Sequence, residues 1–574
     1  MCGIIGLFNY SGSDINQRVE RALETQKHRG PDFQDYKVLK SGSAIGHNRL
    51  SIVDISKYSN QPMYSNSGRF VLVFNGEIYN YLELRAELSS GYSFKTKGDT
   101  EVILAAWEKW GPLCLERFNG MFSFIIVDMQ SFSVYLCRDR FGVKPMFYHQ
   151  ASNGTIYIAS EIKTLWSMGV SKDMNQSVLV DYFKTGSYGM PDESFWSGVQ
   201  QVPGGHIASF KIDDRQVSSF KVERWYNFVN RVENISRPQV DAEIEEQYLD
   251  LLRDAVKLRF RSDVPVGFNI SGGLDSSALL ALVHELFPDN RDIQAFTFYN
   301  DDSRYDELPW VEKMIKRTSK PLNKVLLDVK TLPGLIQNVS DFQDEPFGGF
   351  PTLAYSNIFK LARSKGTTVL LDGQGVDETL AGYDYYRSDS QNLVQGVKTP
   401  PTRFSCISGD LQSKSRNLKY SSPFGDALKN KQYRDLFYTK IPRALRFNDR
   451  VSMMHSTELR EPFLDYRLVE FGFSLNQKHK IKGDQGKWLL RQLMNKKLGN
   501  DVALAPKRPL QTPQREWLAD DLRDYMEEQV ERFKKHSFTE ANEVDKVWRK
   551  YKTGENDNSF YLWQWININT LLAK

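Results

Sequence analysis

The sequence has few cysteines, little net charge and no long apolar run. Its 574 residues contain four cysteines, and no two of them form a CxxC pair. So sparse a set argues against a disulfide framework or a cysteine zinc site, and a reducing cytoplasm is the expected compartment. The four are Cys2, Cys114, Cys137 and Cys406.

The charge balance and the apolar segments argue against two further classes of protein. The formal net charge is +4, from 75 basic and 71 acidic residues, which gives no reason to expect binding to nucleic acid or to an anionic membrane. The apolar opening segment 1–10 is short and no positive charge precedes it, so it does not fit a signal peptide. No other apolar run approaches the length that spans a bilayer, and we expect a cytoplasmic protein.

Length and composition suit a globular protein of two or three domains, with 40% hydrophobic and 25% charged residues. Short strand patterns dominate residues 1–205. Segment 69–80 predicts a strand that stops at Asn75–Gly76, and 121–139 predicts two strands joined by a tight turn. Segment 99–111 has a helical apolar period. Strands paired as hairpins with a few helices indicate a layered α+β domain.

A turn at 202–205 ends this region, and the polar stretch 206–240 is interpreted as an irregular connector. Residues 241–574 follow a different pattern, which begins with an amphipathic helix at 243–262 and becomes mostly helical after about 430. Strands that alternate with helices indicate a parallel, doubly wound sheet in an α/β domain. The candidate buried strands are 264–270, 292–300, 323–329 and 367–372.

Cys2 is the first candidate for catalysis. If Met1 is removed, Cys2 carries a free α-amine beside its thiol. The ordinary pKa of a thiol is about 8.5 and that of an α-amine about 7.7–8, so the amine can take the thiol proton near neutral pH. One residue then supplies both nucleophile and base. The plain alternative is a cysteine at position two by chance.

Three other features suit the same chemistry. Asn75 and Gly76, at the expected strand end, can offer an amide side chain and a backbone N–H to an oxyanion. Arg49, a cation in an apolar segment, can bind a substrate carboxylate through two hydrogen bonds. Asp99 can hold an ammonium group. Taken singly, each also has a structural reading, as a turn asparagine, a surface arginine or a helix cap.

Taken together, these motifs occur in the order seen in class II glutamine amidotransferases, which the N-terminal region resembles. The resemblance implies a four-layer αββα fold of the N-terminal-nucleophile type. It also implies that Cys2 attacks the glutamine amide while Asn75 and Gly76 stabilise the oxyanion. The implied glutamine-binding residues are Arg49, Leu50, Ile52, Glu77 and Asp99. The matching motifs are Met1–Gly6, His28–Asp32, Asn48–Ile52, Phe74–Glu77 and Gly98–Glu101.

A glycine-rich loop predicts a nucleotide site in the second region. It follows a buried strand and opens a helix, an arrangement whose backbone N–H groups and helix N-terminus attract phosphates. The loop lacks the GK[ST] ending of a Walker A motif. It resembles the SGGxDS pyrophosphate loop of ATP pyrophosphatases, which split ATP to AMP and pyrophosphate. Its residues are Ser271, Gly272, Gly273, Leu274, Asp275, Ser276 and Ser277.

A second glycine loop, Gly373–Glu378, follows the strand at 367–372. Two such loops at the carboxyl ends of parallel strands should line one crevice. Asp275 and Asp377 are oxygen ligands suited to Mg²⁺ that carries pyrophosphate. By resemblance, Gly373 joins the nucleotide site and Lys487 neutralises phosphate charge.

Segment 447–465 is a further matching stretch. With it, the chain resembles the glutamine-hydrolysing asparagine synthetases over about residues 1–520. The family mechanism implies that ATP converts an acceptor carboxylate to an acyl-adenylate, which ammonia from glutamine attacks after crossing an internal tunnel. A dry passage keeps ammonia unprotonated and nucleophilic. The expected ligands are glutamine, ATP with Mg²⁺, and a carboxylate acceptor, for which aspartate is favoured. A homodimer is compatible with the resemblance.

Gln374 departs from the family, which typically carries glutamate at this position. A neutral amide cannot accept a proton from attacking ammonia. Either the change is tolerated because Glu378 or Asp344–Glu345 covers the role, or the acceptor has changed. Related proteins amidate other carboxylates, including uronic acids of surface polysaccharides. Segment Pro506–Pro513 either contributes to the acceptor pocket or forms a surface loop.

Two further hypotheses are weaker. A nucleotide-binding or structural protein that has lost catalysis would not need intact Cys2, Arg49 and Asp275. A β-lactam-forming relative would not need the glutaminase nucleophile. Asparagine synthesis is therefore the leading hypothesis, and amidation of another carboxylate is the second.

Overall fold

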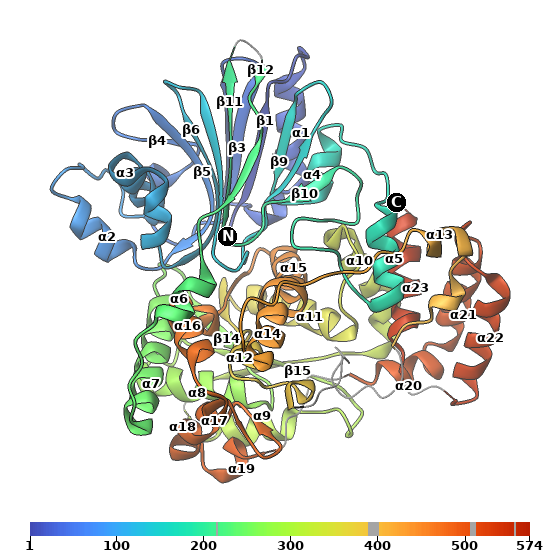
Figure 1. Cartoon of the computed structure of the whole chain (residues 1–574). Coiled ribbons are helices and arrows are strands. Elements are labelled where there is room, and N and C mark those ends of the chain that lie inside the picture. Colours follow the sequence, from blue (N-terminus) through green and yellow to red (C-terminus); the bar gives the residue numbers. More distant parts are fainter. Residues whose placement is uncertain (214–215, 319, 388–400, 506–511, 556–557, 574) are drawn as a thin grey trace.

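A computed structural model describes residues 1–213, 216–318, 320–387, 401–505, 512–555 and 558–573 (Figure 1). In these ranges the chain forms an N-terminal half built on antiparallel sheets, which sits on a C-terminal half built on a parallel sheet. No helix in the described part is both long and apolar enough to cross a membrane. Segment Pro506–Pro513 lies mostly outside the described residues.

Two antiparallel sheets form the centre of the N-terminal half. The first has the order β10-β8-β9-β1-β3-β2, and the second has the order β12-β11-β7-β6-β5-β4, with β13 paired to β11. The first comprises β1 (Gly3–Phe8), β2 (Phe33–Leu39), β3 (Ser43–Arg49), β8 (Phe147–Gln150), β9 (Ile156–Ala159) and β10 (Val199–Gln201). The second comprises β4 (Met63–Tyr64), β5 (Phe70–Ile78), β6 (Gly120–Asp128), β7 (Ser133–Arg138), β11 (His206–Asp213), β12 (Gln216–Val217) and β13 (Lys221–Arg224).

The alternation of side chains along each strand creates the layers. In β1, Ile4 and Phe8 pack between the two sheets, whereas Ile5 and Leu7 pack in the core that also holds residues of the covering helices. Helices α1 (Ile15–Thr25) and α4 (Ile162–Ser167) cover the first sheet, and α2 (Tyr81–Leu88) and α3 (Asp99–Trp110) cover the second. The predicted αββα sandwich is confirmed.

The expectation of irregular structure from 206 to 240 is wrong. Strand β11 pairs with β7 through five residue pairs, and β13 pairs with β11, so both extend the second sheet. The missed signal is an alternation in which Ala208, Phe210 and Ile212 are buried and the polar residues Ser209 and Lys211 lie between them. Helix α6 (Phe228–Asn234) follows.

The C-terminal half contains a five-stranded, fully parallel sheet of order β16-β15-β14-β17-β18. Leu370 packs against one helical layer, while Val369 and Leu371 pack against the layer on the other face. This confirms the doubly wound α/β architecture. The strands are β14 (Val266–Asn269), β15 (Ala295–Tyr299), β16 (Leu322–Leu326), β17 (Val369–Leu371) and β18 (Glu458–Arg460).

Strand β18 was not predicted, because two of its three residues are charged and the region after 430 has a helical pattern. Glu458 and Arg460 are nevertheless fully buried. Hydrogen bonding to β17 gives the segment its extended conformation, with Leu371 opposite Arg460. Charged strands are rare in cores, so the local sequence favours no strand here.

Helices enclose the parallel sheet, and the last of them also support the N-terminal half. Gln564 of the final helix donates its side-chain N–H to the carbonyl of Tyr182 in α5 (Gln176–Thr185), and Figure 1 shows these helices side by side. The main helices are α7 (Asp241–Arg259), α8 (Leu274–Leu286), α9 (Leu308–Ile315), α10 (Leu332–Gln343), α11 (Phe350–Ser364), α15 (Lys440–Met453), α16 (Tyr466–Ser474), α18 (Trp488–Leu498), α20 (Gln514–Ala519), α21 (Arg523–Lys534), α22 (Ala541–Lys552) and α23 (Phe560–Leu572).

Candidate functional site

Cys2 lies immediately before β1 and between two other segments of its predicted site. Its backbone N–H donates to Asn75 Oδ1 at 2.9 Å, and its Sγ lies 3.9 Å from the Leu50 carbonyl oxygen. Only 8% of the residue is exposed. Burial raises the pKa of the Cys2 thiol above its usual value, because a thiolate loses its hydration there. The resting thiol is therefore neutral and needs a base to become a nucleophile.

Asn75 and Gly76 lie inside β5, not at its end as expected. Pairing with β6 continues through Gly76 opposite Phe122 to Ile78 opposite Gly120. Gly76 has φ +149°, and a Cβ atom there would lie 2.1 Å from the Met121 carbonyl oxygen. The position therefore requires glycine because of both its backbone conformation and its close packing.

Arg49 is held in place by neutral oxygens. Its Nη1 donates to the Ser56 carbonyl and to Asn60 Oδ1, each at 2.7 Å, and its Nη2 donates to the Asp54 carbonyl. These acceptors orient the guanidinium without neutralising it, so its charge suits a carboxylate ligand. Leu50 and Ile52 follow it and are both buried.

Asp99 and Glu77 bring two buried carboxyl groups to the same region. Asp99 opens α3, whose N-cap is Gly98, and its Oδ2 accepts a hydrogen bond from the Ile78 N–H at 2.9 Å. Burial raises the pKa of Asp99 to about 6. The pKa of Glu77 is also raised, first by burial and then by the charges of Glu458 and Asp99. Such a pair suits a cationic ligand such as an ammonium group.

The N-terminus lies at the boundary between the two halves (Figure 1). The Met1 ammonium is 2.9 Å from Glu458 Oε2, and Arg460 Nε contacts the other oxygen of that carboxylate at 2.6 Å. With Met1 in place, the nitrogen of Cys2 is an amide and cannot act as a base. The self-base hypothesis for Cys2 therefore requires that Met1 is removed.

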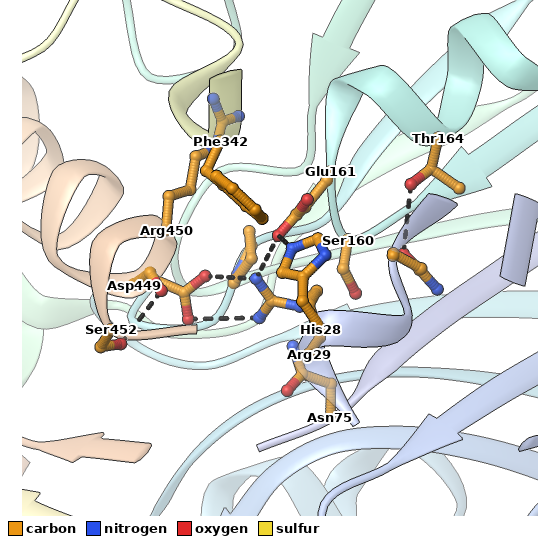
Figure 2. A network of polar contacts seen from close by, with 12 residues as sticks. His28, Arg29, Asn75, Ser160, Glu161, Thr164, Phe342, Asp449, Arg450 and Ser452 are labelled. Carbon is orange, nitrogen blue, oxygen red and sulfur yellow. Dashed lines mark hydrogen bonds and ion pairs between the residues drawn. The ribbon is translucent and has the colours of Figure 1, made fainter. Parts of the chain in front are cut away.

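A buried ionic network joins the Cys2 region to the C-terminal half (Figure 2). Arg29 Nε donates to the Cys2 carbonyl at 3.0 Å, while its Nη1 contacts Glu161 Oε1 at 3.0 Å and Asp449 Oδ2 at 2.9 Å. His28 Nε2 also lies 3.0 Å from Glu161 Oε1. Sequence reasoning did not assign a role to Arg29, although the residue is part of a motif that identified the family.

Replacing Arg29 by methionine should destabilise the protein strongly. The change leaves Glu161 and Asp449 as buried carboxylates without their shared cation, which typically costs about 3–5 kcal/mol in the free energy of unfolding. A clear fall in Tm is expected by differential scanning calorimetry. The control is Arg21→Met on the exposed side of α1, which should leave Tm unchanged. Equal Tm values for both variants would contradict a stabilising role for the network.

The predicted nucleotide loop has the expected strand–loop–helix geometry, between β14 and α8. Ser276 Oγ accepts from the Ser271 N–H at 3.1 Å, and Glu307 Oε2 accepts from the Gly272 N–H at 3.1 Å. Ser277 is fully buried, and its Oγ donates to the Gly273 carbonyl. Ser277 therefore supports the loop from within.

The two glycine loops line one cavity of about 560 Å³, as expected from the parallel sheet. Gln374 lines it together with Lys487, whose Nζ lies 2.7 Å from Asp275 Oδ2 and 2.8 Å from Asp377 Oδ1. Burial opposes the charge of Lys487, but the two carboxylates outweigh it and raise the lysine pKa. The lining segments are 271–276, 372–374, 382–384 and 484–487, with Tyr355, Asp377, Arg387, Arg491, Val502, Leu504 and Ala505.

The donor set at this cavity fits Mg²⁺ carried by a nucleotide. In the described part of the chain, no cluster of three or more His, Cys, Asp or Glu side chains is arranged to hold a metal. Mg²⁺ usually binds through one or two carboxylates and takes its other ligands from water and substrate phosphates. Asp275 and Asp377 would supply such a pair.

Glu461 is a buried carboxyl group that sequence reasoning missed. It follows β18 and is 3% exposed, and both the backbone of Gln374 and the charge of Asp372 act on its carboxyl group. The residues considered as substitutes for the family glutamate have other contacts. Glu378 accepts from the Tyr383 hydroxyl at 2.8 Å, and Asp344–Glu345 contact Lys163 and Arg446 at the boundary between the halves. The only local signal for Glu461 in the sequence was its place between a charged segment and Pro462.

Each half of the chain matches a known protein family. Residues 1–226 match the family of glutamine amidotransferase domains, and residues 247–573 match the asparagine synthase family. Asparagine synthetase [glutamine-hydrolyzing] 3 of Bacillus subtilis is 28% identical over 89% of this chain and 86% of its own length. Asparagine synthetase [glutamine-hydrolyzing] 1 of the same organism is 26% identical over 99% of this chain and 97% of its own.

A relative with a different name is also similar over nearly the whole length. Amidase chry2 of Gibberella zeae is 23% identical over 92% of both chains. The family model for asparagine synthase alone covers more than half of the 574 residues. The chain therefore belongs to the asparagine synthase family and is an ATP-dependent, glutamine-hydrolysing ligase whose N-terminal half is a glutamine amidotransferase domain.

Proposed function

We propose that the protein is an asparagine synthetase of the cytoplasm. ATP adenylates the side-chain carboxylate of aspartate, and ammonia released from glutamine at Cys2 is channelled to the adenylate. The products are asparagine, AMP, pyrophosphate and glutamate. We also propose that residues 1–205 hold the glutaminase site and 241–574 hold the synthetase site, while 206–240 first complete the second sheet through β11 and β13 and then lead into the C-terminal half.

One observation supports the coupling of the two reactions more than any other. Strand β18 runs from the Cys2 region, where Glu458 meets the N-terminus, to the nucleotide cavity, where Glu461 meets Gln374. Three strand residues span about 10 Å. The proposed sites for ammonia release and ammonia use would then lie near opposite ends of one short buried strand.

In the glutaminase site, we assign nucleophilic attack to Cys2 and oxyanion stabilisation to Asn75 and Gly76. The side-chain amide of Asn75 is already anchored beside Cys2, as an oxyanion donor must be before the reaction. Removal of Met1 would supply the base as the α-amine of Cys2. Glutamine would be bound by Arg49, Leu50, Ile52, Glu77 and Asp99.

In the synthetase site, we propose that the glycine loops and Lys487 bind the phosphates of ATP. Bound Mg²⁺ would neutralise pyrophosphate charge, and Asp275 with Asp377 would hold the ion. The backbone of the first loop would bind oxygens of pyrophosphate. The assigned phosphate-binding residues are Ser271, Gly272, Gly273, Leu274, Asp275, Ser276, Gly373 and Lys487, with Ser277 in support and Gln374 facing the acceptor.

The second candidate function is amidation of another carboxylate, such as a uronic acid of a surface polysaccharide. Gln374 favours it, because the lining of the cavity differs at the acceptor position from the family pattern. The name of the similar Amidase chry2 is consistent with chemistry other than asparagine synthesis on this fold. The glutamine and nucleotide machinery would be the same for both acceptors.

Pyrophosphate release separates the two candidates. Purified protein is given ATP, Mg²⁺ and glutamine, with or without aspartate, and the products are analysed for asparagine. Aspartate-dependent pyrophosphate together with asparagine supports the first function. Glutamate release with no response to aspartate would reject it, and sugar acids would then be assayed as acceptors.

Binding of glutamine should weaken below pH 6. Asp99 must be ionised to pair with the glutamine ammonium, and its pKa of about 6 in the free enzyme means that this charge is lost as pH falls through that value. We expect the Kd of glutamine to rise about tenfold per pH unit below 6. The measurement is calorimetric titration of a Cys2→Ala variant, which binds without reacting. In Asp99→Asn, binding should be weak throughout and lack this inflection.

A further inference from the structure

The cavity lacks a proton acceptor at the position where its family carries one. If ammonia attacks an acyl-adenylate here, as the proposed function states, the nitrogen must lose a proton when the C–N bond forms. Gln374 lines the cavity, but its neutral amide cannot take that proton. A carboxylate elsewhere in this chain, close to the loop, is therefore the group to look for.

Glu461 is the carboxylate that the fold places against this loop. The backbone carbonyl of Arg460, the residue before it, accepts from the Asp372 N–H at 3.0 Å, which places Glu461 beside the loop that carries Gln374, and the charge of Asp372 acts on its carboxyl group. Its Oε2 is buried and has no hydrogen-bond partner within the described residues. A buried carboxylate oxygen without a partner is costly and calls for an explanation, of which a catalytic role is one.

The position of Glu461 also suits the arrival of ammonia from the glutaminase half. Lys144, from the N-terminal half, has its Nζ 3.5 Å from the carbonyl oxygen of Leu459 in β18, two residues before Glu461. On the other side, Asp372 and Gln374 line the nucleotide cavity. Glu461 thus lies between the N-terminal half and the cavity.

Two other carboxylates near this loop, Asp372 and Glu378, already accept hydrogen bonds. Asp372 accepts from the Gly373 N–H through Oδ1 and from the Tyr355 hydroxyl through Oδ2. Glu378 is occupied by Tyr383. Burial and the charge of Asp372 raise the pKa of Glu461, so its carboxylate holds a proton more strongly than an exposed glutamate does.

We propose that Glu461 is the catalytic base of amide formation in this protein and replaces the glutamate absent at position 374. The ammonia nitrogen bonds to the acyl carbon, and one N–H proton passes to Glu461 Oε2. The bond between the acyl carbon and the phosphate oxygen then breaks, and AMP leaves with the electron pair. Glu461 later loses the proton to water, and no oxidant or reductant is needed.

The test separates three reactions of the full-length protein. Glutamate release reports the glutaminase, acceptor-dependent ATP–pyrophosphate exchange reports adenylate formation, and product analysis reports the amide. Each is measured with aspartate and with glucuronate as acceptor. For Glu461→Gln we expect amide formation from the acceptor that the wild type uses to fall about 10²–10³-fold. Glutamate release and exchange should remain at the wild-type rate.

A second variant shows whether the rate falls because a carboxylate is lost or because the loop is disturbed. Adding Gln374→Glu to Glu461→Gln returns a carboxylate to the same loop and should restore most of the lost rate. Glu531→Gln, on the exposed side of α21, is the matched control for loss of a carboxylate and should keep all three activities. Wild-type amide formation by Glu461→Gln, or a failure of Gln374→Glu to restore it, would overturn the proposal. If the wild type amidates neither acceptor and shows no exchange, the proposed function itself fails, and the assignment of Glu461 fails with it.

Discussion

Replacing Cys2 by alanine should abolish the use of glutamine and leave synthesis from added ammonia intact. The Cys2 thiol lies beside Asn75 and near Leu50, and loss of an essential nucleophile lowers a rate by at least about 10³-fold. The nucleotide cavity contains no atom of this residue. Glutamate release should therefore fall to background, while pyrophosphate release with ammonium chloride and the acceptor continues at the wild-type rate.

The matched control for this prediction is a second buried cysteine. Cys406 is fully buried in the C-terminal half, and we assign it no chemistry. Cys406→Ala should keep both activities, since it tests only the loss of a small buried side chain. Loss of ammonia-dependent synthesis in Cys2→Ala would contradict two separate sites. Retained glutamate release would remove Cys2 from the mechanism.

Replacing Lys487 by alanine should have the opposite pattern, with adenylate formation lost and glutamine hydrolysis kept. The ammonium group lies within 3 Å of Asp275 and Asp377 at the cavity that we assign to ATP. Its removal leaves two neighbouring carboxylates facing the phosphates, and loss of one electrostatic contact of this kind typically costs about 10²–10³ in rate. Acceptor-dependent ATP–pyrophosphate exchange is the measurement.

Two further variants refine the prediction for Lys487. Lys496 lies on α18 with a largely exposed side chain, and Lys496→Ala should leave the exchange rate unchanged. Lys487→Arg keeps the charge and should retain more exchange activity than Lys487→Ala. Unchanged exchange in Lys487→Ala would show that the lysine serves only to pair Asp275 with Asp377.

Much of this architecture can be predicted where short-range patterns determine it. The loop at 271–277 predicts a phosphate site because glycines follow a buried strand and precede a helix, and the structure has that geometry. The αββα sandwich follows in part from alternating strands such as 121–139. Patterns of this kind depend on residues close together in the sequence, so they can be recognised without knowledge of the fold.

The errors fall where distant segments determine the conformation. Gly76 lies within β5 because pairing with β6 continues to Ile78, although the residue suggests a strand end. Strand β18 is charged, and only its pairing with β17 makes it a strand. Strand β11 was taken as connector because the polar residues Ser209 and Lys211, which are not buried, separate its buried ones.

The sequence by itself determined the family, the order of the two halves and the chemical types of the residues in each site, because motif residues lie close together along the chain. The tertiary structure alone decided which buried charges meet. Arg29 meets Asp449 and Glu461 meets Gln374 through packing between segments far apart in the sequence. Burial makes these contacts strong, since the cost of an unpaired charge depends on surroundings that a linear pattern does not describe.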